Sequence, residues 1–192
     1  CKDVFPPRSL LSSSSEKLHS VLGDVAGRRV LDIGTGTGIQ AIHAAKSGAA
    51  EVVPTDINSA AVACARENIV LNDVSDRVTV LSSDLFDSLE KGEQYDIVIA
   101  NLPIVDYPLD GIVESALYDP GYAIHERFFK EAGEHLSTGG AIIMSHADFK
   151  GQQSFEEFEG YVKSHGYRAE TYIETEAWGH RFRTYRFKLI NT

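Results

Sequence analysis

The sequence predicts an α/β fold, a doubly wound sheet of seven strands that is mostly parallel and ends in an antiparallel hairpin. Short runs rich in valine and isoleucine alternate with segments of helical period, which is typical of parallel strands joined by crossover helices. A glycine-rich turn follows the first run, and two β-like runs flank a Trp-Gly pair near the end. With 192 residues, 43% of them hydrophobic, the chain can enclose one sizeable core. We therefore expect a single domain over 1–192, in which 28–192 form the core and 1–27 cover the substrate or cofactor.

Five apolar runs are predicted to be strands because each is short and rich in β-branched residues. Four segments of helical period lie between and after them, and Asn58 or Ser59 is the candidate cap of the second, while Gly48 ends the first. The tail at 167–190 has no helical period, so we expect a hairpin at the sheet edge. The strands are expected at 28–33, 50–57, 77–84, 95–101 and 140–146, and the helices at 38–48, 58–73, 122–137 and 152–166.

The charge balance limits the expected partners. The 28 acidic and 18 basic side chains give a formal net charge of -10, which repels phosphate backbones. A nucleic acid is therefore less expected as a partner than a protein, a peptide or a small molecule. No run approaches the roughly 20 apolar residues that span a bilayer, and the first residues lack the apolar core of a secretory signal. We expect a cytoplasmic protein without a membrane partner.

The two cysteines, Cys1 and Cys64, are expected to form neither a disulfide framework nor a metal site. Cys64 lies in a helical pattern and is expected in the core, because buried free cysteine is common and unreactive. No metal is predicted.

A glycine loop joins the first predicted strand to the following helix, with Gly34, Gly36 and Gly38 in succession. Glycine permits a tight turn and lets a ligand approach the backbone, while the helix start offers free N-H groups. The loop also fits the dinucleotide pattern G-x-G-x-x-A, so a nicotinamide-dependent oxidoreductase stays open, as does a turn that binds nothing. Asp32 favours S-adenosylmethionine, since a carboxylate two residues before the first glycine can hold an ammonium but would repel a pyrophosphate.

Two further acids agree with a nucleoside that carries an amino acid. Asp56 ends the second predicted strand, 22 residues past Gly34, where it can accept both ribose hydroxyls. Asp84 follows the third predicted strand and can face the adenine amino group, with the amide of Leu85 at a ring nitrogen. The predicted cofactor-binding residues are Asp32, Gly34, Thr35, Gly36, Gly38, Asp56, Ile57, Asp84, Leu85 and Asn101.

Together these motifs resemble the class I S-adenosylmethionine-dependent methyltransferases, from about Val30 to Ala147. The succession SDLFD, NLPI, RFF and GG is similar to that of the release-factor glutamine methyltransferases and related small-domain methyltransferases. The resemblance implies a Rossmann-like fold, S-adenosylmethionine as the cofactor and methyl transfer as the activity.

The stretch Asn101-Leu102-Pro103-Ile104 follows the fourth predicted strand and is similar to the Asn-Pro-Pro-Tyr motif of methyltransferases that modify planar nitrogens. The side-chain oxygen of Asn101 and the carbonyl of Leu102 can take the hydrogens of an NH2 nucleophile and aim its lone pair at the methyl group. Pro103 stiffens the loop that carries them. These three are the predicted catalytic residues. Taken alone, the same residues also fit a strand end, where Asn and Pro are common.

The substrate side is less defined by the sequence. Ile104 departs from the aromatic residue of the family motif, and Tyr107 either replaces that ring or is a surface tyrosine. Ile104, Tyr107 and Asp106 are the predicted substrate contacts. The irregular segment that follows is predicted to be a functional lid, and His125 is either a base or structural. This segment also contains acids that either receive a cationic group of the substrate or form a solvated face: Asp106, Asp110, Glu114 and Asp119.

Basic side chains gather near the end of the sequence. They either track a nucleic acid or guard an edge strand against aggregation, and we favour the guard. His180 and Trp178 are expected in the hairpin turn. The basic residues are Arg181, Arg183, Arg186 and Lys188.

We therefore expect an S-adenosylmethionine-dependent methyltransferase that modifies an amide or amine nitrogen of a protein, peptide or small molecule. The alternatives are an rRNA or tRNA base N-methyltransferase and, from another class, a cofactor-binding but inactive partner subunit. The sequence leaves the acceptor and the oligomeric state open.

Overall fold

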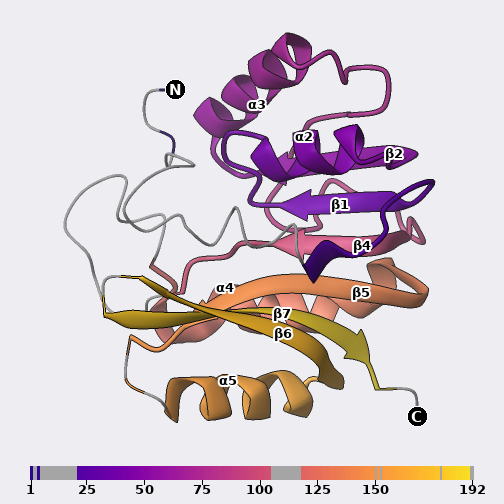
Figure 1. Cartoon of the computed structure of the whole chain (residues 1–192). Coiled ribbons are helices and arrows are strands. Elements are labelled where there is room, and N and C mark those ends of the chain that lie inside the picture. Colours follow the sequence, from indigo (N-terminus) through magenta and orange to yellow (C-terminus); the bar gives the residue numbers. More distant parts are fainter. Residues whose placement is uncertain are drawn as a thin grey trace.

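A computed structural model describes residues 1, 4, 21–104, 118–149, 151, 153–177 and 179–190. It contains the alternating strands and helices that the sequence predicts (Figure 1). The elements are β1 (Arg29–Ile33), α2 (Ile39–Lys46), β2 (Glu51–Asp56), α3 (Ser59–Leu71), β3 (Leu81–Ser82), β4 (Tyr95–Ala100), η2 (Pro120–Tyr122), α4 (Ala123–Glu131), η3 (Ala132–His135), β5 (Leu136–Ala147), α5 (Gln153–Ser164), β6 (Tyr167–Ala177) and β7 (His180–Leu189).

The sheet has seven strands in the order β3-β2-β1-β4-β5-β7-β6. The first five in this order are parallel, and β7 is antiparallel to both β5 and β6. The predicted fold class, a doubly wound sheet with a C-terminal antiparallel hairpin, is confirmed. The strand order reverses beside β1, and crevices at such reversals are where ligands bind in open α/β sheets.

Helices cover both faces of the sheet because successive strand residues point to opposite sides. Val30 of β1 packs in a core cluster with residues of α2 and α3. Its neighbour Leu31 packs in a second cluster with Phe128 of α4 and Phe158 of α5. The two clusters are the cores of the two faces, and the carboxyl ends of the parallel strands lie at the edge between them.

Two strands differ in length from the prediction. The third was expected over 77–84, but only Leu81–Ser82 is a strand, preceded by an isolated bridge between Val52 and Val78. The fifth begins at Leu136 rather than at 140, so the preceding helix ends earlier than expected. The added residues form a bulge, since the register with β4 shifts between Tyr95 and Ile97. Gly140 lies in this bulge, where a Cβ would come within 2.9 Å of the Ser137 carbonyl oxygen.

The start of α3 and the end of α2 agree with the sequence. Asn58 caps α3, because its side chain accepts a hydrogen bond of 2.9 Å from the backbone N-H of Ala60. The first crossover helix ends at Lys46, and Gly48 follows in the left-handed conformation. Within the part of the chain that the structure describes, no helix is long and apolar enough to cross a bilayer.

The basic strand β7 lies inside the sheet, between β5 and β6, so the interpretation of its arginines as an edge guard is wrong. The hairpin turns back so that β6 takes the outer position. The guanidinium groups of β7 instead pair with acids of neighbouring elements: Arg181 Nε lies 3.1 Å from Asp148, Arg183 Nε 2.8 Å from Glu174 and Arg186 Nε 3.0 Å from Glu170.

The cysteines also differ from the expectation. Cys1 and Cys64 form a disulfide, with their Cα atoms 6.0 Å apart. The sequence did not indicate this pairing because the two residues are 63 positions apart, and only the fold brings them together. Cys64 is buried on α3 beside Val4, which belongs to the same small cluster.

Candidate active site

The carboxyl ends of β2, β1 and β4 lie side by side at one edge of the sheet. Ile33 at the end of β1 is in register with Thr55 of β2 and with Ala100 of β4. The residues that follow these three, Gly34, Asp56 and Asn101, therefore leave the sheet at the same level. The structure thus brings three separate sequence motifs to one place.

The glycine loop after β1 has two kinds of glycine. All three have positive φ, which side chains rarely adopt. A Cβ on Gly34 or Gly36 would meet no described atom within 4 Å, whereas one on Gly38 would lie 3.2 Å from the Cβ of Ala65. Gly38 is therefore required for close packing of α2 against α3. Gly34 and Gly36 leave the backbone open on the side that a ligand can approach.

Asp32 is a buried carboxylate, with only 1% of its surface exposed. Thr35 Oγ1 donates a hydrogen bond of 2.6 Å to it. Burial, together with the charge of Asp56, raises the pKa of Asp32 to about 7, although the hydrogen bonds act in the opposite direction. Among the residues that the structure describes, no cationic side chain pairs with this acid. A ligand ammonium would supply the missing charge.

Asp56, the last residue of β2, holds the glycine loop in place through its carboxylate. Its Oδ2 accepts a hydrogen bond of 2.9 Å from the Gly36 N-H, and its Oδ1 accepts one of the same length from the Asn58 N-H. Each carboxylate oxygen keeps a second lone pair for a ligand hydroxyl. Ile57, the next residue, is 70% exposed, so an apolar surface lies directly beside these acceptors.

Asp84 is held by a residue that the sequence reasoning did not single out. Arg127 of α4 donates from Nη1 to Asp84 Oδ2 at 2.8 Å and also pairs with Asp87. Leu85 is buried and has a positive φ of 48°. Arg127 thereby ties the loop after β3 to α4. The one sequence signal for an ordered Arg127 is Glu131 four residues later, which pairs with its Nε at 2.9 Å.

Asn101 follows β4 and is half-buried. Its side chain makes no hydrogen bond to another residue that the structure describes. Leu102 is buried in the core cluster under α4 and α5, and Pro103 and Ile104 are partly exposed. Tyr107, with Asp106, Asp110 and Glu114, lies outside the described residues, as does Trp178.

Asp119 differs from the expectation of a solvated acid. Its side chain and that of His125 are fully buried, and Asp119 Oδ2 lies 2.7 Å from Nδ1 of His125. No local sequence pattern indicates this pairing, because the two residues are six positions apart across irregular chain and the start of a helix. His180, expected in the hairpin turn, is instead the first residue of β7 after the turn, and its Nδ1 lies 3.4 Å from Asp148.

Comparison with known proteins gives the family. The family model for ribosomal protein L11 methyltransferase (PrmA) matches residues 16–125. A relative from Methanocaldococcus jannaschii, provisionally named as a protein N5-glutamine methyltransferase, is 33% identical over 157 residues, which are 79% of this chain and 76% of the relative. The chain belongs to the PrmA methyltransferase family. Its enzyme class is therefore methyltransferase, as the sequence predicted.

Other members of these methyltransferase groups are longer than this chain. A ribosomal protein L11 methyltransferase of Lactobacillus johnsonii is 37% identical over 62% of this chain but only 31% of its own length. A release factor glutamine methyltransferase of Rhodopirellula baltica is 31% identical over 74% of this chain and 54% of its own length. The chain thus spans about a third to a half of these two relatives.

Solved structures share the fold of this PrmA-family chain. The ribosomal protein L11 methylase of Lactobacillus delbrueckii subsp. bulgaricus has a TM-score of 0.68 at 20% identity and covers 88% of this chain and 74% of its own. Methanocaldococcus jannaschii Trm5 in complex with adenosine has a TM-score of 0.70 at 18% identity, over 99% of this chain and 52% of its own. At these identities the likeness concerns the fold.

Proposed function

We propose that the chain transfers a methyl group from S-adenosylmethionine to an amide or amine nitrogen of a protein, peptide or small molecule. This proposal rests on two polar side chains, Asp32 and Asn101, at one edge of the sheet. Asp32 is a buried carboxylate without a cationic partner among the described residues, and at the same edge the Asn101 amide makes no hydrogen bond to any residue that the structure describes. The first suits the ammonium of the methyl donor, and the second suits the hydrogens of an NH2 acceptor.

Each cofactor contact can be assigned from the chemistry of the residues present. Asp32 would hold the ammonium, and the open backbone at Gly34 and Gly36 would face the amino-acid part. Asp56 would accept the ribose hydroxyls with its remaining lone pairs. Ile57 would pack on the adenine ring. S-adenosylmethionine, when bound, supplies an electrophilic methyl group on a sulfonium. The full set is Asp32, Gly34, Thr35, Gly36, Gly38, Asp56, Ile57, Asp84, Leu85 and Asn101.

Asp84 has a reduced role in this proposal. Its carboxylate already pairs with Arg127, although half of the side chain remains exposed. The adenine amino group would therefore meet an acid whose charge is partly compensated. The N-H of Leu85 would face a ring nitrogen, and its carbonyl already accepts a hydrogen bond of 3.0 Å from Ser83 Oγ.

The acceptor nitrogen would be aimed by the loop after β4. The Asn101 oxygen and the Leu102 carbonyl would accept its two hydrogens, which turns the lone pair toward the methyl carbon. The buried Leu102 side chain anchors this loop in the core, and Pro103 restricts its backbone. An amide or ring amine loses its proton after the methyl arrives, so the site needs little proton chemistry. Ile104 would border the acceptor, and Asp106 and Tyr107 stay predicted substrate contacts.

Protein acceptors are favoured by the names of the relatives. Ribosomal protein L11 and release factor are proteins of translation, which supports a protein acceptor and a cytoplasmic location for this chain. A tRNA or rRNA base is the second candidate, because Trm5 and a tRNA methyltransferase of Bacillus subtilis share the fold.

Incubation with isotope-labelled methyl donor and fractionated lysate tests the proposal. Label on protein or small molecules is expected, whereas label on RNA would favour the second candidate. Titration calorimetry should show that S-adenosylmethionine binds and NADH does not. Tighter binding of NADH would overturn the methyltransferase proposal, and donor binding without transfer to any fraction would indicate an inactive partner subunit.

A further inference from the structure

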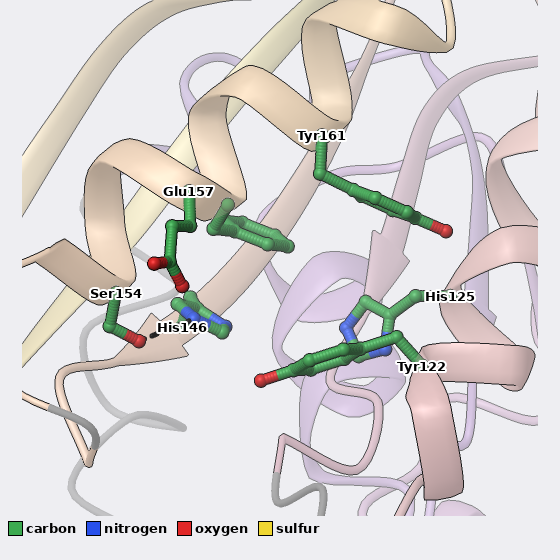
Figure 2. A pocket seen from close by; sticks show the side chains of 7 residues that line it. Tyr122, His125, His146, Ser154, Glu157 and Tyr161 are labelled. Carbon is green, nitrogen blue, oxygen red and sulfur yellow. Dashed lines mark hydrogen bonds between the residues drawn. The ribbon is translucent and has the colours of Figure 1, made fainter.

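A cavity of about 160 Å³ lies on the α4 and α5 face of the sheet, where β5 ends (Figure 2). Tyr122 and His125 approach it from the start of α4, His146 from β5, and Phe158 and Tyr161 from α5. An engineered apolar cavity of about 150 Å³ holds benzene, so this one is large enough for a small organic group. None of the cofactor contacts proposed above lines it.

One residue that lines the cavity, His125, carries a ring nitrogen with no hydrogen-bond partner among the described residues. The Asp119 carboxylate accepts hydrogen bonds from the backbone N-H groups of Ile124 and His125, at 2.8 and 3.1 Å, and lies 2.7 Å from His125 Nδ1. These bonds hold the pKa of Asp119 below its ordinary value despite its burial, so the acid stays ionised. In the tautomer that donates its ring proton from Nδ1 to Asp119, the other ring nitrogen is an acceptor. Nε2 keeps a lone pair, is buried and has no hydrogen-bond partner in the described part of the chain.

A second residue that lines the cavity, Tyr161, also carries a buried polar atom. The hydroxyl of Tyr161 is buried and has no hydrogen-bond partner among the described residues. Burial first, and then the negative charges of Glu126 and Asp119, raise the pKa of Tyr161 to about 12. Both acids act on the hydroxyl, although Glu126 is itself paired with Lys130 at 2.6 Å. Glu157, an exposed acid on α5, adds a carboxylate to the cavity wall.

Aromatic rings and the Ser154 side chain form the rest of the lining, and Ser154 Oγ donates a hydrogen bond of 3.2 Å to the Ala147 carbonyl. His146 stacks on Phe158 with ring centroids 4.1 Å apart and an interplanar angle of 8°. Tyr122 meets His125 edge-on at 5.6 Å. Tyr122 adopts a positive φ of 56°, which costs a non-glycine residue energy and here carries its ring to the cavity. No Lys or Arg is among the residues that line this cavity in the described ranges.

We infer that this cavity binds an organic ammonium group, supplied by a free amine or by an amine-bearing side chain. The aromatic faces attract a cation, the acids favour its charge, and His125 Nε2 and the Tyr161 hydroxyl can accept its hydrogens. An anion would meet no Lys or Arg side chain among the lining residues. A purely apolar group would leave His125 Nε2 and the Tyr161 hydroxyl without a hydrogen-bond partner.

The position of the cavity suggests its use. Ala100, the last residue of β4, is in register with Met144 of β5, two residues before His146. Leu102, which follows Asn101, belongs to the same core cluster as Phe158 of the cavity wall, so the loop that carries Asn101 lies near the cavity. We therefore take the ammonium to belong to the methyl acceptor, at a position other than its reacting nitrogen. This last step rests on the proposed function, whereas cation binding itself does not.

The direct test compares probes of one size and different charge. Binding of n-butylammonium, n-butanol and butyrate is followed by NMR titration of the aromatic resonances of the full chain. Saturable binding of n-butylammonium is expected, at least about fivefold tighter than n-butanol, with butyrate weakest. Equal binding of n-butanol, preference for butyrate or no saturation would overturn the inference. N-acetyl-lysine N-methylamide then distinguishes the two sources of the ammonium group. If the ligand is an amine-bearing side chain, this compound should bind with an affinity similar to that of n-butylammonium.

Two variants place the binding in this cavity. Tyr161→Phe removes one acceptor at constant shape, and Glu157→Gln removes one exposed charge, so neither threatens folding. Each should weaken n-butylammonium binding about twofold to fivefold. Glu156→Gln is the matched control, because Glu156 is an exposed acid on the same helix that does not line the cavity. Equal effects of the Glu156 and Glu157 variants, together with an unaffected Tyr161→Phe protein, would contradict the assignment.

The test separates this inference from the proposed function. Binding of S-adenosylmethionine is measured on the same samples and should be unchanged by both variants. Cofactor binding with no ammonium binding would overturn only the cavity assignment. Ammonium binding without methyl transfer would overturn only the proposed function.

Discussion

The carboxylate of Asp119 lies 2.7 Å from Nδ1 of His125, and neither side chain is exposed. Six positions separate the two residues in the sequence, and the positive φ angles of Gly121 and Tyr122 turn the chain between them. Asp119 also accepts the first free N-H groups of α4, so one acid serves as the cap of the helix and orients the imidazole. This pair fixes the wall of the cavity on the side of α4.

Asp119→Asn should lower the free energy of unfolding by about 1.5 to 3 kcal/mol near pH 7, because charged hydrogen bonds in a buried site are lost. The pKa of Asp119 is lowered in the folded protein, so its contribution is complete above the ordinary value of 3.8 and is lost as pH falls through the folded value. Urea unfolding at pH 7 measures the effect. Asp76→Asn, at an exposed acid, is the control and should change little; equal effects would contradict the role of Asp119.

Asp32 should destabilise the cofactor-free protein as pH rises. Its folded pKa of about 7 lies above the ordinary 3.8, so the folded state binds the extra proton between these values and stability falls from about pH 4 to pH 7. Asp32→Asn should remove this loss and raise the free energy of unfolding at pH 7 by about 1 to 3 kcal/mol. Urea unfolding of both proteins at pH 5 and pH 7.5 checks it. The same variant should lose affinity for S-adenosylmethionine, and a less stable variant at pH 7.5 would contradict this account.

Asp56→Ala should weaken S-adenosylmethionine binding about tenfold or more, because a charge-assisted hydrogen bond of about 1.5 to 3 kcal/mol is lost. It also releases the N-H of Gly36, so the glycine loop loses a support. Titration calorimetry measures the affinity. Glu67→Gln, an exposed acid on α3, serves as the control. Unchanged affinity in Asp56→Ala would mean that Asp56 does not hold the ribose.

Asn101→Ala should leave the fold and cofactor affinity nearly intact but slow methyl transfer about 30-fold to 1000-fold, the effect of about 2 to 4 kcal/mol in the transition state. If Asn101 only ends a strand, the melting temperature changes instead and the rate per folded molecule does not. Ile104→Tyr sharpens the comparison, since a flat conjugated acceptor should tolerate the new ring and a bulky aliphatic one should not. Single-turnover rates with the identified acceptor decide between these cases.

Methyl transfer should depend only weakly on salt, and RNA should not compete. Counterion release produces a steep loss of affinity when several cations contact phosphates. Here the net charge is -10, and Arg181, Arg183 and Arg186 of β7 are paired with acids of neighbouring elements. Initial rates between about 50 and 200 mM salt, with and without bulk tRNA, provide the measurement. A steep negative salt dependence with labelled RNA would favour the base methyltransferase.

The order of strands and helices and the glycine loop could be read from the sequence because they depend on local patterns. Alternation, helical period, the Asn58 cap and the glycines after β1 act over a few residues each. Parallel connectivity then brings the ends of β1, β2 and β4 to one edge, so the clustering of Asp32, Asp56 and Asn101 also followed.

Only the tertiary structure decided which side chains pair across elements. Arg127 reaches Asp84 because α4 packs beside the loop after β3, and β7 lies inside the sheet because it turns back from β6 and pairs with β5. Asp119 becomes a buried partner of His125, and the cavity forms where α4 and α5 meet the end of β5. These features depend on how long-range contacts enclose polar groups. A charged residue in a sequence has no local pattern that distinguishes an exposed face from a buried pair.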